Sequence, residues 1–249
     1  MSTFKDHFSG HANQYAKYRP SYPESWFATL AERALEQNLA WDVATGSGQA
    51  AVALAKHFQR VYATDASEAQ VQQGTPDPRV RYAVEPAERT ALEPASVDLV
   101  TVAQALHWFD APRFFEEVRR VLKPGGVWAC WCYALAYVSP EVDERLLGFY
   151  DGPIGPYWPP ERRILERGYR DIEIPLEEWP APEVAMAVRW NRAEFLGYLG
   201  TWSACQRYEK ATGVNPLHAF SEEVAEVWPV DEVREVRFPL AVRWGRRNP

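Results

Sequence analysis

The chain has 249 residues and a net charge of −7; 47% of its residues are hydrophobic and 24% are charged. This composition is ordinary for a globular enzyme with one core, and the acidic balance argues against a nucleic-acid partner bound mainly through phosphates. No apolar run fits a signal peptide or a membrane helix, so we expect a soluble, cytoplasmic protein with no membrane partner.

The N-terminal segment, residues 1–23, is polar and rich in aromatic residues. Pro23 and Glu24 then open a predicted helix that continues to about Gln37. Its apolar side carries Trp26 and Phe27, which indicates a helix packed against a core rather than one surrounded by water.

The most informative segment is Trp41-Asp42-Val43-Ala44-Thr45-Gly46-Ser47-Gly48-Gln49-Ala50. It predicts a short strand, a glycine turn and the start of a helix that continues to Phe58. A second strand, Val61 to Asp65, ends in a carboxylate about twenty residues after the first glycine. In nucleotide-binding α/β units, such a turn brings the backbone close to the ligand and the acid accepts hydrogen bonds from ribose hydroxyls.

The details of this motif separate two kinds of cofactor. A dinucleotide fold prefers three glycines in the pattern G-x-G-x-x-G, but this chain has Ala51 at the third position, which is sometimes tolerated. Asp42 would repel a pyrophosphate, whereas it suits a ligand that carries an amino group. An NAD-dependent oxidoreductase therefore remains the weaker alternative.

Further predicted strands follow, with a helix between the fourth and the fifth. Residues 80–84 and 96–102 predict the third and fourth strands, Asp110 predicts an N-cap for a helix that ends before Pro124, and residues 127–133 predict a central fifth strand. Cys130 and Cys132 lie on this last strand, in an apolar setting typical of buried, reduced thiols, and we expect no metal site.

The C-terminal half has a different order of predicted elements, with helices between two strands. Ser139-Pro140 opens a helix, residues 169–177 and 233–244 predict two strands, and two helices are expected over residues 191–208 and 216–228. The first of these begins with a capping box formed by Asn191 and Glu194. We expect the two strands to form an antiparallel pair at the sheet edge, and residues 137–168 and 180–230 to form cap insertions over it.

The order Asp42-x-Ala44-x-Gly46-x-Gly48 resembles the first motif of the class I S-adenosylmethionine-dependent methyltransferases, which usually have glycine where this chain has Ala44. Further segments match that family in register: Val61 to Asp65 as strand two, Pro86-Ala87-Glu88 as the loop beside the adenine, Ser96 to Val102 as strand four, Gln104 to Phe109 after it, and Leu122 to Val127 as the turn into strand five.

The resemblance implies an α/β, Rossmann-like methyltransferase fold, with a seven-stranded, mostly parallel sheet, an antiparallel edge strand, helices on both faces and a small helical cap. It implies one methyltransferase domain over residues 1–249, with residues 35–133 as the cofactor-binding core and residues 1–23 as an N-terminal lid. The implied cofactor is S-adenosyl-L-methionine, and the implied activity is methyl transfer.

Roles for individual residues follow from the same resemblance. Gly46 and Gly48 would let the backbone pack beneath the cofactor, Asp42 would hold its amino group directly or through water, and Asp65 would accept its ribose hydroxyls. The remaining implied contacts are Ala44, Ser47, Ala66, Ala87, Glu88, Gln104 and Ala105.

His107 is the candidate catalytic residue, because ligands gather after the strands of open parallel sheets. It would act as a general base on a hydroxyl acceptor, or would orient a carboxylate that needs no base. A loop histidine bonded only to the backbone is an equally open alternative.

Tyr15 to Pro23, Gln104 to Phe109 and Tyr198 to Ser203 are similar to segments of small-molecule methyltransferases related to trans-aconitate methyltransferase. This similarity implies a small acid or amphiphilic acceptor, methylated at oxygen under an aromatic lid. The implied lid or substrate residues are Tyr15, Tyr18, Arg19 and Trp108, and Arg19, Arg189, Arg192 and Arg207 are candidate carboxylate ligands. We expect a small-molecule partner, no nucleic acid, and a monomer or homodimer; a catalytically inactive cofactor-binding module is the main alternative to an enzyme.

Overall fold

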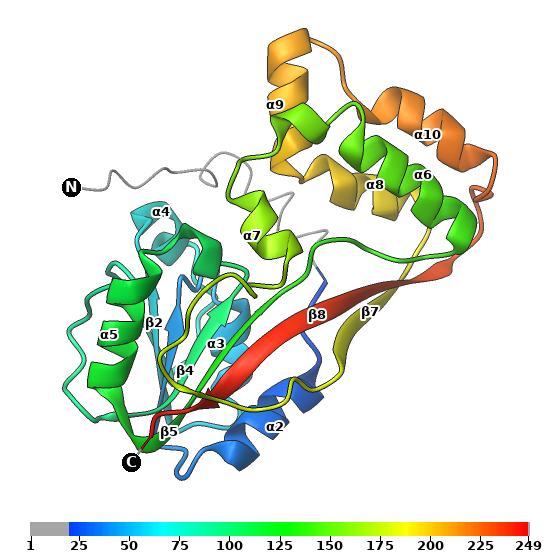
Figure 1. Ribbon diagram of the computed structural model, residues 1–249. Coiled ribbons are helices and arrows are strands. Elements are labelled where there is room, and N and C mark those ends of the chain that lie inside the picture. The colour runs from blue at the N-terminus through cyan, green and yellow to red at the C-terminus, as the bar shows by residue number, and fades with distance from the viewer. Residues whose placement is uncertain (1–19, 249) are drawn as a thin grey trace.

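The computed structural model describes residues 20–248, and the sheet is its organising element (Figure 1). The strands are β1 (Leu39–Val43), β2 (Arg60–Asp65), β3 (Val80–Val84), β4 (Val97–Ala103), β5 (Leu122–Cys132), β6 (Glu177–Glu178), β7 (Val184–Trp190) and β8 (Arg234–Arg246). The helices are α2 (Glu24–Arg33), α3 (Gln49–Leu54), α4 (Glu68–Gln72), α5 (Ala111–Val121), α6 (Pro140–Asp151), α7 (Arg162–Glu166), α8 (Arg192–Gly200), α9 (Ser203–Thr212) and α10 (Leu217–Ala225), with 3-10 turns η1 (Leu106–Trp108) and η2 (Gly155–Tyr157).

The strand order is β3-β2-β1-β4-β5-β8-β6, and the first five strands are parallel. β8 runs antiparallel to β5. β6 and β7 both pair with β8, β6 at its C-terminal end and β7 along its N-terminal half. Eight strands therefore occupy seven positions across the sheet, which confirms the predicted mostly parallel methyltransferase sheet with an antiparallel edge.

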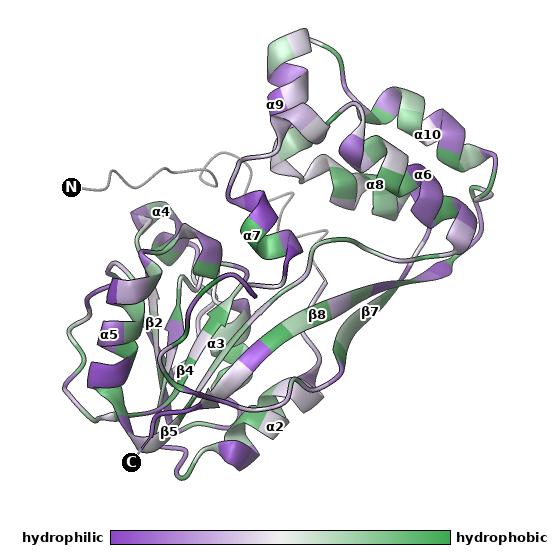
Figure 2. Ribbon diagram, in the orientation of Figure 1, coloured by the Kyte–Doolittle hydropathy of each residue, from purple (hydrophilic) through white to green (hydrophobic). Residues whose placement is uncertain are grey.

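Helices cover both faces of the sheet. Trp26 and Phe27 of α2 and Leu54 of α3 pack on one face, and Phe114 and Val118 of α5 pack on the other. In Figure 2, α5 carries apolar and polar residues in alternating bands, because one side of the helix contacts the sheet and the other contacts water.

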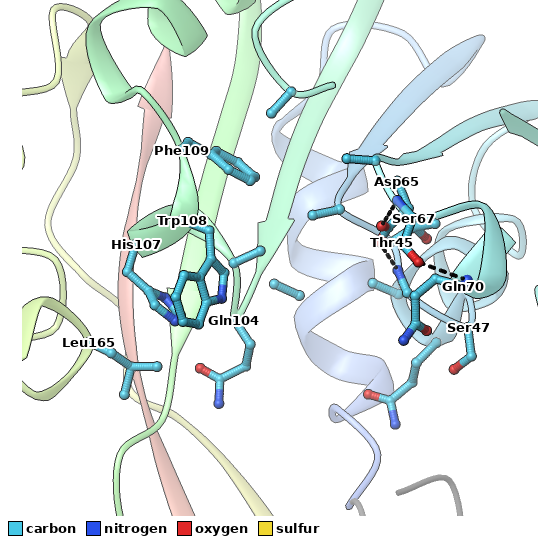
Figure 3. Close-up of a pocket in the computed structure, with 18 of the residues that line it drawn as sticks. Thr45, Ser47, Asp65, Ser67, Gln70, Gln104, His107, Trp108, Phe109 and Leu165 are labelled. Carbon is cyan, nitrogen blue, oxygen red and sulfur yellow. Dashed lines mark hydrogen bonds between the residues drawn. The ribbon is translucent and has the colours of Figure 1, made fainter. Parts of the chain in front are cut away.

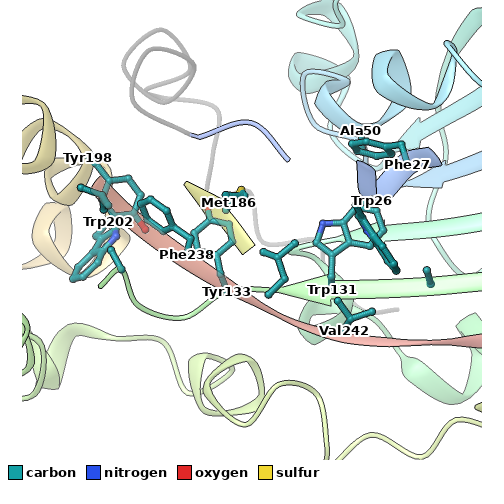
Figure 4. Packing of buried hydrophobic residues seen from close by; sticks show 14 of the residues in the cluster. Trp26, Phe27, Ala50, Trp131, Tyr133, Met186, Tyr198, Trp202, Phe238 and Val242 are labelled. Carbon is teal, nitrogen blue, oxygen red and sulfur yellow. The ribbon is translucent and has the colours of Figure 1, made fainter. Parts of the chain in front are cut away.

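The helices α6, α8, α9 and α10 gather beyond the sheet as a cap, and the long strand β8 runs between the two (Figure 1). One cluster of buried apolar residues continues from α2 through β5 and β8 into the cap (Figure 4). Phe238 of β8 is central to it, since its ring contacts those of Tyr133, Trp190 and Tyr198.

The strand predicted at residues 169–177 was wrong except for its last residue. Gly168 and Tyr169 have φ angles of +60° and +63°, a left-handed conformation that turns the chain instead of extending it. Arg243 of β8 then donates to the carbonyl oxygens of Tyr169 and Ile172, which holds the segment as a loop against the sheet. The outer side of β8 is instead paired with the short β6 and with β7, and β7 lies inside the range that we expected to belong to the cap.

Within residues 20–248, no helix combines the length and the apolar character needed to cross a membrane. The same residues contain no cluster of three or more His, Cys, Asp or Glu side chains able to hold a metal ion.

Candidate functional site

A cleft of about 1330 Å3 lies between the carboxyl ends of β1, β2 and β4 and the cap. Figure 3 shows its two walls, with Asp65, Ser67 and Gln70 on one side and His107 and Trp108 on the other. A pocket for one drug-sized ligand has about 300–1000 Å3, so this cleft has space for a second ligand.

The turn after β1 forms part of one wall. Ala44 and Gly46 have φ angles of +51° and +56°, and both line the cleft with Ser47. A left-handed conformation is easy for glycine but costs an alanine about 1 kcal/mol. Ala44 is thus held in a strained conformation, which explains why glycine is the usual residue at this position in the family that the motif resembles.

Gly48 was expected to contact the cofactor, but it does not line the cleft among the described residues. It precedes α3 with a φ of +85°, and a Cβ atom built on it would lie 1.9 Å from the Tyr82 hydroxyl oxygen. The glycine is required by the packing of β3 against the turn and by the left-handed backbone.

Asp65 ends β2 at the wall of the cleft. Its Oδ2 accepts a hydrogen bond of 2.9 Å from the backbone N–H of Gly46, and its Oδ1 accepts one of 2.9 Å from Ser67. These bonds fix the carboxylate at the wall of the cleft, between the ends of two strands. Ala66 beside it is exposed and also lines the cleft.

Asp42 lies deeper and is only 1% exposed. Its carboxylate accepts hydrogen bonds from the hydroxyls of Thr45, at 2.6 Å, and Thr101, at 2.7 Å. Burial raises the pKa of Asp42 to about 6, although both threonines oppose that change. Sequence reasoning found this acid but not the two hydroxyls that orient it.

The loop after β3 supplies the predicted adenine-side contacts, and Ala87 and Glu88 both line the cleft. Glu88 also accepts a 3.0 Å hydrogen bond from the backbone N–H of Asp110, which connects this loop to the start of α5. Its side chain therefore has a structural partner besides any ligand.

Gln104 and Ala105 follow β4, and both line the cleft. Gln104 has a φ of +58°, and its side-chain amide makes two hydrogen bonds to the backbone of Tyr133, at 3.0 and 3.1 Å. This pairing connects the end of β4 to the end of β5 at the wall of the cleft.

His107 and Trp108 lie next to each other in η1 and both line the cleft. The Nδ1 atom of His107 is 3.3 Å from the Tyr169 hydroxyl, so its partner is a side chain rather than the backbone. Burial, together with the positive charge of Arg162, lowers the pKa of His107 to about 3. The imidazole is neutral at neutral pH and is a weak base.

Arg162 is the cleft residue that sequence reasoning missed. It begins α7, lines the cleft, and its guanidinium lies 4.5 Å from the ring centroid of Trp158. It is one of 22 arginines, and only the position of α7 between sheet and cap distinguishes it from the others. The proline- and glycine-rich segment before it gave no sequence signal for that position.

Three of the four predicted carboxylate ligands lie away from the cleft. Among the described residues, Arg189, Arg192 and Arg207 do not line the cleft. Arg189 is exposed on β7, and Arg192 donates to the carbonyl oxygen of Trp228 within the cap. Tyr15, Tyr18 and Arg19 lie outside the described residues.

The tryptophans of the C-terminal half divide between the wall of the cleft and the packed interior. Trp158 and Trp202 line the cleft. Trp228 is fully buried in the cap against Phe195, while Trp179 packs on Trp244 of β8.

The chain is similar to known proteins in both sequence and structure. A family model described as a methyltransferase domain matches residues 41–130. A Dictyostelium discoideum protein named as a methyltransferase is 30% identical over 245 residues, covering 95% of this chain and 93% of that protein. A Saccharomyces cerevisiae protein named a probable S-adenosylmethionine-dependent methyltransferase is also 30% identical, with 93% and 91% covered. A solved structure from Anaeromyxobacter dehalogenans, described as a type II methyltransferase, is 45% identical with a TM-score of 0.89, covering 93% of this chain and 99% of that one.

Proposed function

Since this chain belongs to the class I S-adenosylmethionine-dependent methyltransferases, we propose that it methylates an oxygen atom of a small-molecule acceptor, a carboxylate or a hydroxyl. The observation that carries the proposal is a single cleft with two different halves. The half at the strand ends is lined by the predicted cofactor contacts other than Gly48, and the half under the cap is lined by aromatic rings and Arg162.

The residues at the strand ends fit the cofactor. Asp65 is held at the wall by the backbone of Gly46 and Ser67, where its carboxylate would accept the ribose hydroxyls, and Ala44 and Gln104 adopt left-handed conformations at the ends of their strands. The buried carboxylate of Asp42 would favour the amino group of the cofactor, and Ala87 and Glu88 would flank its adenine. When bound, the cofactor supplies a methyl group activated by a sulfonium sulfur.

The residues of the acceptor half favour an acceptor whose nucleophilic oxygen needs no general base. Methyl transfer from a sulfonium is an in-line displacement, so the protein contributes mainly alignment and exclusion of water. His107, whose pKa is lowered to about 3, would be a poor general base near neutral pH. A carboxylate acceptor is already ionised there, and His107 would orient it.

The first test is calorimetric titration with S-adenosylhomocysteine, the product form of the cofactor. We expect binding by the natural chain and a loss of about 100-fold or more for Asp65→Ala, which removes the ribose acceptor and leaves two backbone N–H groups unpaired. Asp171→Ala is the matched control, since Asp171 is an exposed acid on the loop after α7, paired with Arg167. A folded natural chain that does not bind would contradict the proposal.

The second test is turnover. The protein is incubated with S-adenosylmethionine and separate panels of small carboxylic acids and small alcohols or phenols, and release of S-adenosylhomocysteine is measured. Methyl esters are cleaved by mild alkali whereas methyl ethers are not, so the product identifies the oxygen that was methylated. Methylation only of amines would contradict O-methylation while leaving the family assignment intact.

A further inference from the structure

Arg162 is held by the structure in a way that leaves part of its guanidinium available to the cleft. Its Nε donates to the Tyr150 hydroxyl at 2.7 Å, and its Nη2 donates to the carbonyl oxygen of Ala134 at 2.6 Å. Among the described residues Nη1 makes no hydrogen bond, although Arg162 lines the cleft and its side chain is only 15% exposed. A preorganised donor group of this kind is suited to a planar anion.

Among the described residues, the acidic partner of Arg162 is at the long end of the ion-pair range and is shared with another group. Glu166 is the acidic partner of Arg162, 3.8 Å from its Nε, but it also accepts a hydrogen bond from Tyr150. Glu161 is a second acid that lines the cleft. The positive charge of Arg162 acts on His107, where it adds to burial in lowering the pKa of the imidazole. The guanidinium therefore supplies positive charge to the region between Arg162 and His107.

The surroundings of this positive region are apolar and aromatic. Trp158 and Trp202 lie 5.5 Å apart between ring centroids, and both line the cleft together with Leu165 and Trp108. Rings of this kind bind flat or apolar groups, while a single fixed charge selects the end of the ligand that points toward it.

We propose that Arg162 is the specificity-determining residue of the acceptor half, and that it selects acceptors in which a carboxylate is attached to a flat or apolar body. The carboxylate binds the free side of the guanidinium next to His107, and the body contacts the tryptophans. This inference rests on the proposed function, because it assigns the acceptor class for the same cleft.

The test uses matched pairs of acids and amides as probes: phenylacetate with phenylacetamide, cinnamate with cinnamamide, and octanoate with octanamide. Each probe is titrated by calorimetry into protein saturated with S-adenosylhomocysteine. We expect at least one acid to bind about tenfold or more tightly than its amide, as a charge-assisted hydrogen bond would give. Arg162→Gln should abolish this preference, and Arg162→Lys should retain only part of it, because lysine keeps the charge but not the planar fork.

Arg163→Gln is the matched control, since Arg163 is the next residue of α7 and is exposed. We expect it to leave the acid-to-amide ratio unchanged. A purely structural role of Arg162, through Tyr150 and Ala134, would weaken acid and amide alike in Arg162→Gln, and that result would overturn the proposal. Equal binding of acids and amides to the natural chain, or no binding of any acid to the loaded protein, would overturn it as well.

Failure of this inference is distinguishable from failure of the proposed function. If S-adenosylhomocysteine binds and an oxygen acceptor is methylated, but the natural chain and Arg162→Gln show the same acid-to-amide preference, the proposed function stands and the role of Arg162 is wrong. If S-adenosylhomocysteine does not bind, the proposed function fails first.

Discussion

At the scale of single residues, Asp42 is a buried acid whose protonation is linked to folding. Its pKa rises from 3.8 to about 6 on burial, so the folded state binds a proton more readily than the unfolded state. The stabilisation that results is fully present below pH 3.8 and is lost as the pH rises through 6; the shift corresponds to about 3 kcal/mol.

Asp42→Asn should reveal how much the ionised, buried carboxylate destabilises the folded state above pH 6. Asparagine has the same shape and no charge, and the hydroxyls of Thr45 and Thr101 can both donate and accept. We expect the free energy of unfolding at pH 8 to increase by up to about 3 kcal/mol over the natural chain, and the gain to vanish near pH 4. Urea unfolding at both pH values measures this, and affinity for S-adenosylhomocysteine should fall in the same variant. A variant less stable than the natural chain at pH 8 would refute the account.

His107 gives a prediction about the pH dependence of catalysis. Because burial and Arg162 lower its pKa to about 3, the residue does not titrate in the range in which the enzyme is assayed. We expect kcat/KM for a carboxylate acceptor to show no inflection from His107 between about pH 5 and pH 9. His107→Gln should lose less than about tenfold in activity, whereas removal of a general base typically costs about 100-fold or more. An inflection near neutral pH that disappears in the variant would instead identify His107 as the base.

At the scale of elements, the contact between the β1–α3 turn and β3 depends on Gly48. Gly48→Ala combines a left-handed alanine with a clash against the Tyr82 ring, and we expect it to cost about 3 kcal/mol or more. Gly213→Ala is the control, since Gly213 ends α9 with a φ of +74° and nothing lies within 4 Å of the added carbon; it should cost about 1 kcal/mol. Thermal unfolding measures both. Adding Tyr82→Ala should recover part of the loss only in the Gly48 variant, and no recovery would show that the clash is unimportant.

Elements with strong local signals could be predicted from the sequence, and those defined by distant contacts could not. The turn at Gly46, the acid at Asp65 and the capping box at Asn191 are local patterns, and the structure contains each of these elements. The segment at residues 169–177 has the apolar content of a strand, but its loop conformation depends on Arg243, far along the chain. Arg162 was missed for the same reason, because its position is set by contacts with Tyr150 and Ala134 that form only when the cap is folded.

At the scale of the whole molecule, β8 joins the sheet and the cap into one structural unit. Its residues 234–240 pair with β7 and its residues 241–246 pair with β5. Because both halves share this strand and one hydrophobic cluster, we expect them to unfold together rather than as separate domains.

Phe238→Ala tests this cooperativity, because Phe238 is fully buried where β8 meets the cap. Loss of its ring contacts should cost about 3–5 kcal/mol. Differential scanning calorimetry should still give one transition at a lower temperature, with equal calorimetric and van't Hoff enthalpies. Leu147→Ala, at a half-exposed position on α6, should change stability by no more than about 0.5 kcal/mol. Two transitions, only one of them shifted, would show that the cap is an independent domain.

The change of partner along β8 also marks a junction for recombination. Leu240 is the last residue paired with β7, and Ala241, directly after it, is paired with Cys132 at the end of β5. β5 ends at Cys132 and its pairing with β8 begins at Ala241, and the one contiguous stretch between them carries Arg162, Trp158 and Trp202. Two crossovers, one at each boundary, would graft this part of the acceptor half of one relative onto another, while His107 and Trp108 would stay with the recipient. Arg243 of β8 donates hydrogen bonds to the carboxylate of Glu178 and to the carbonyl oxygen of Tyr169, both in the grafted stretch. Such a hybrid must preserve these contacts.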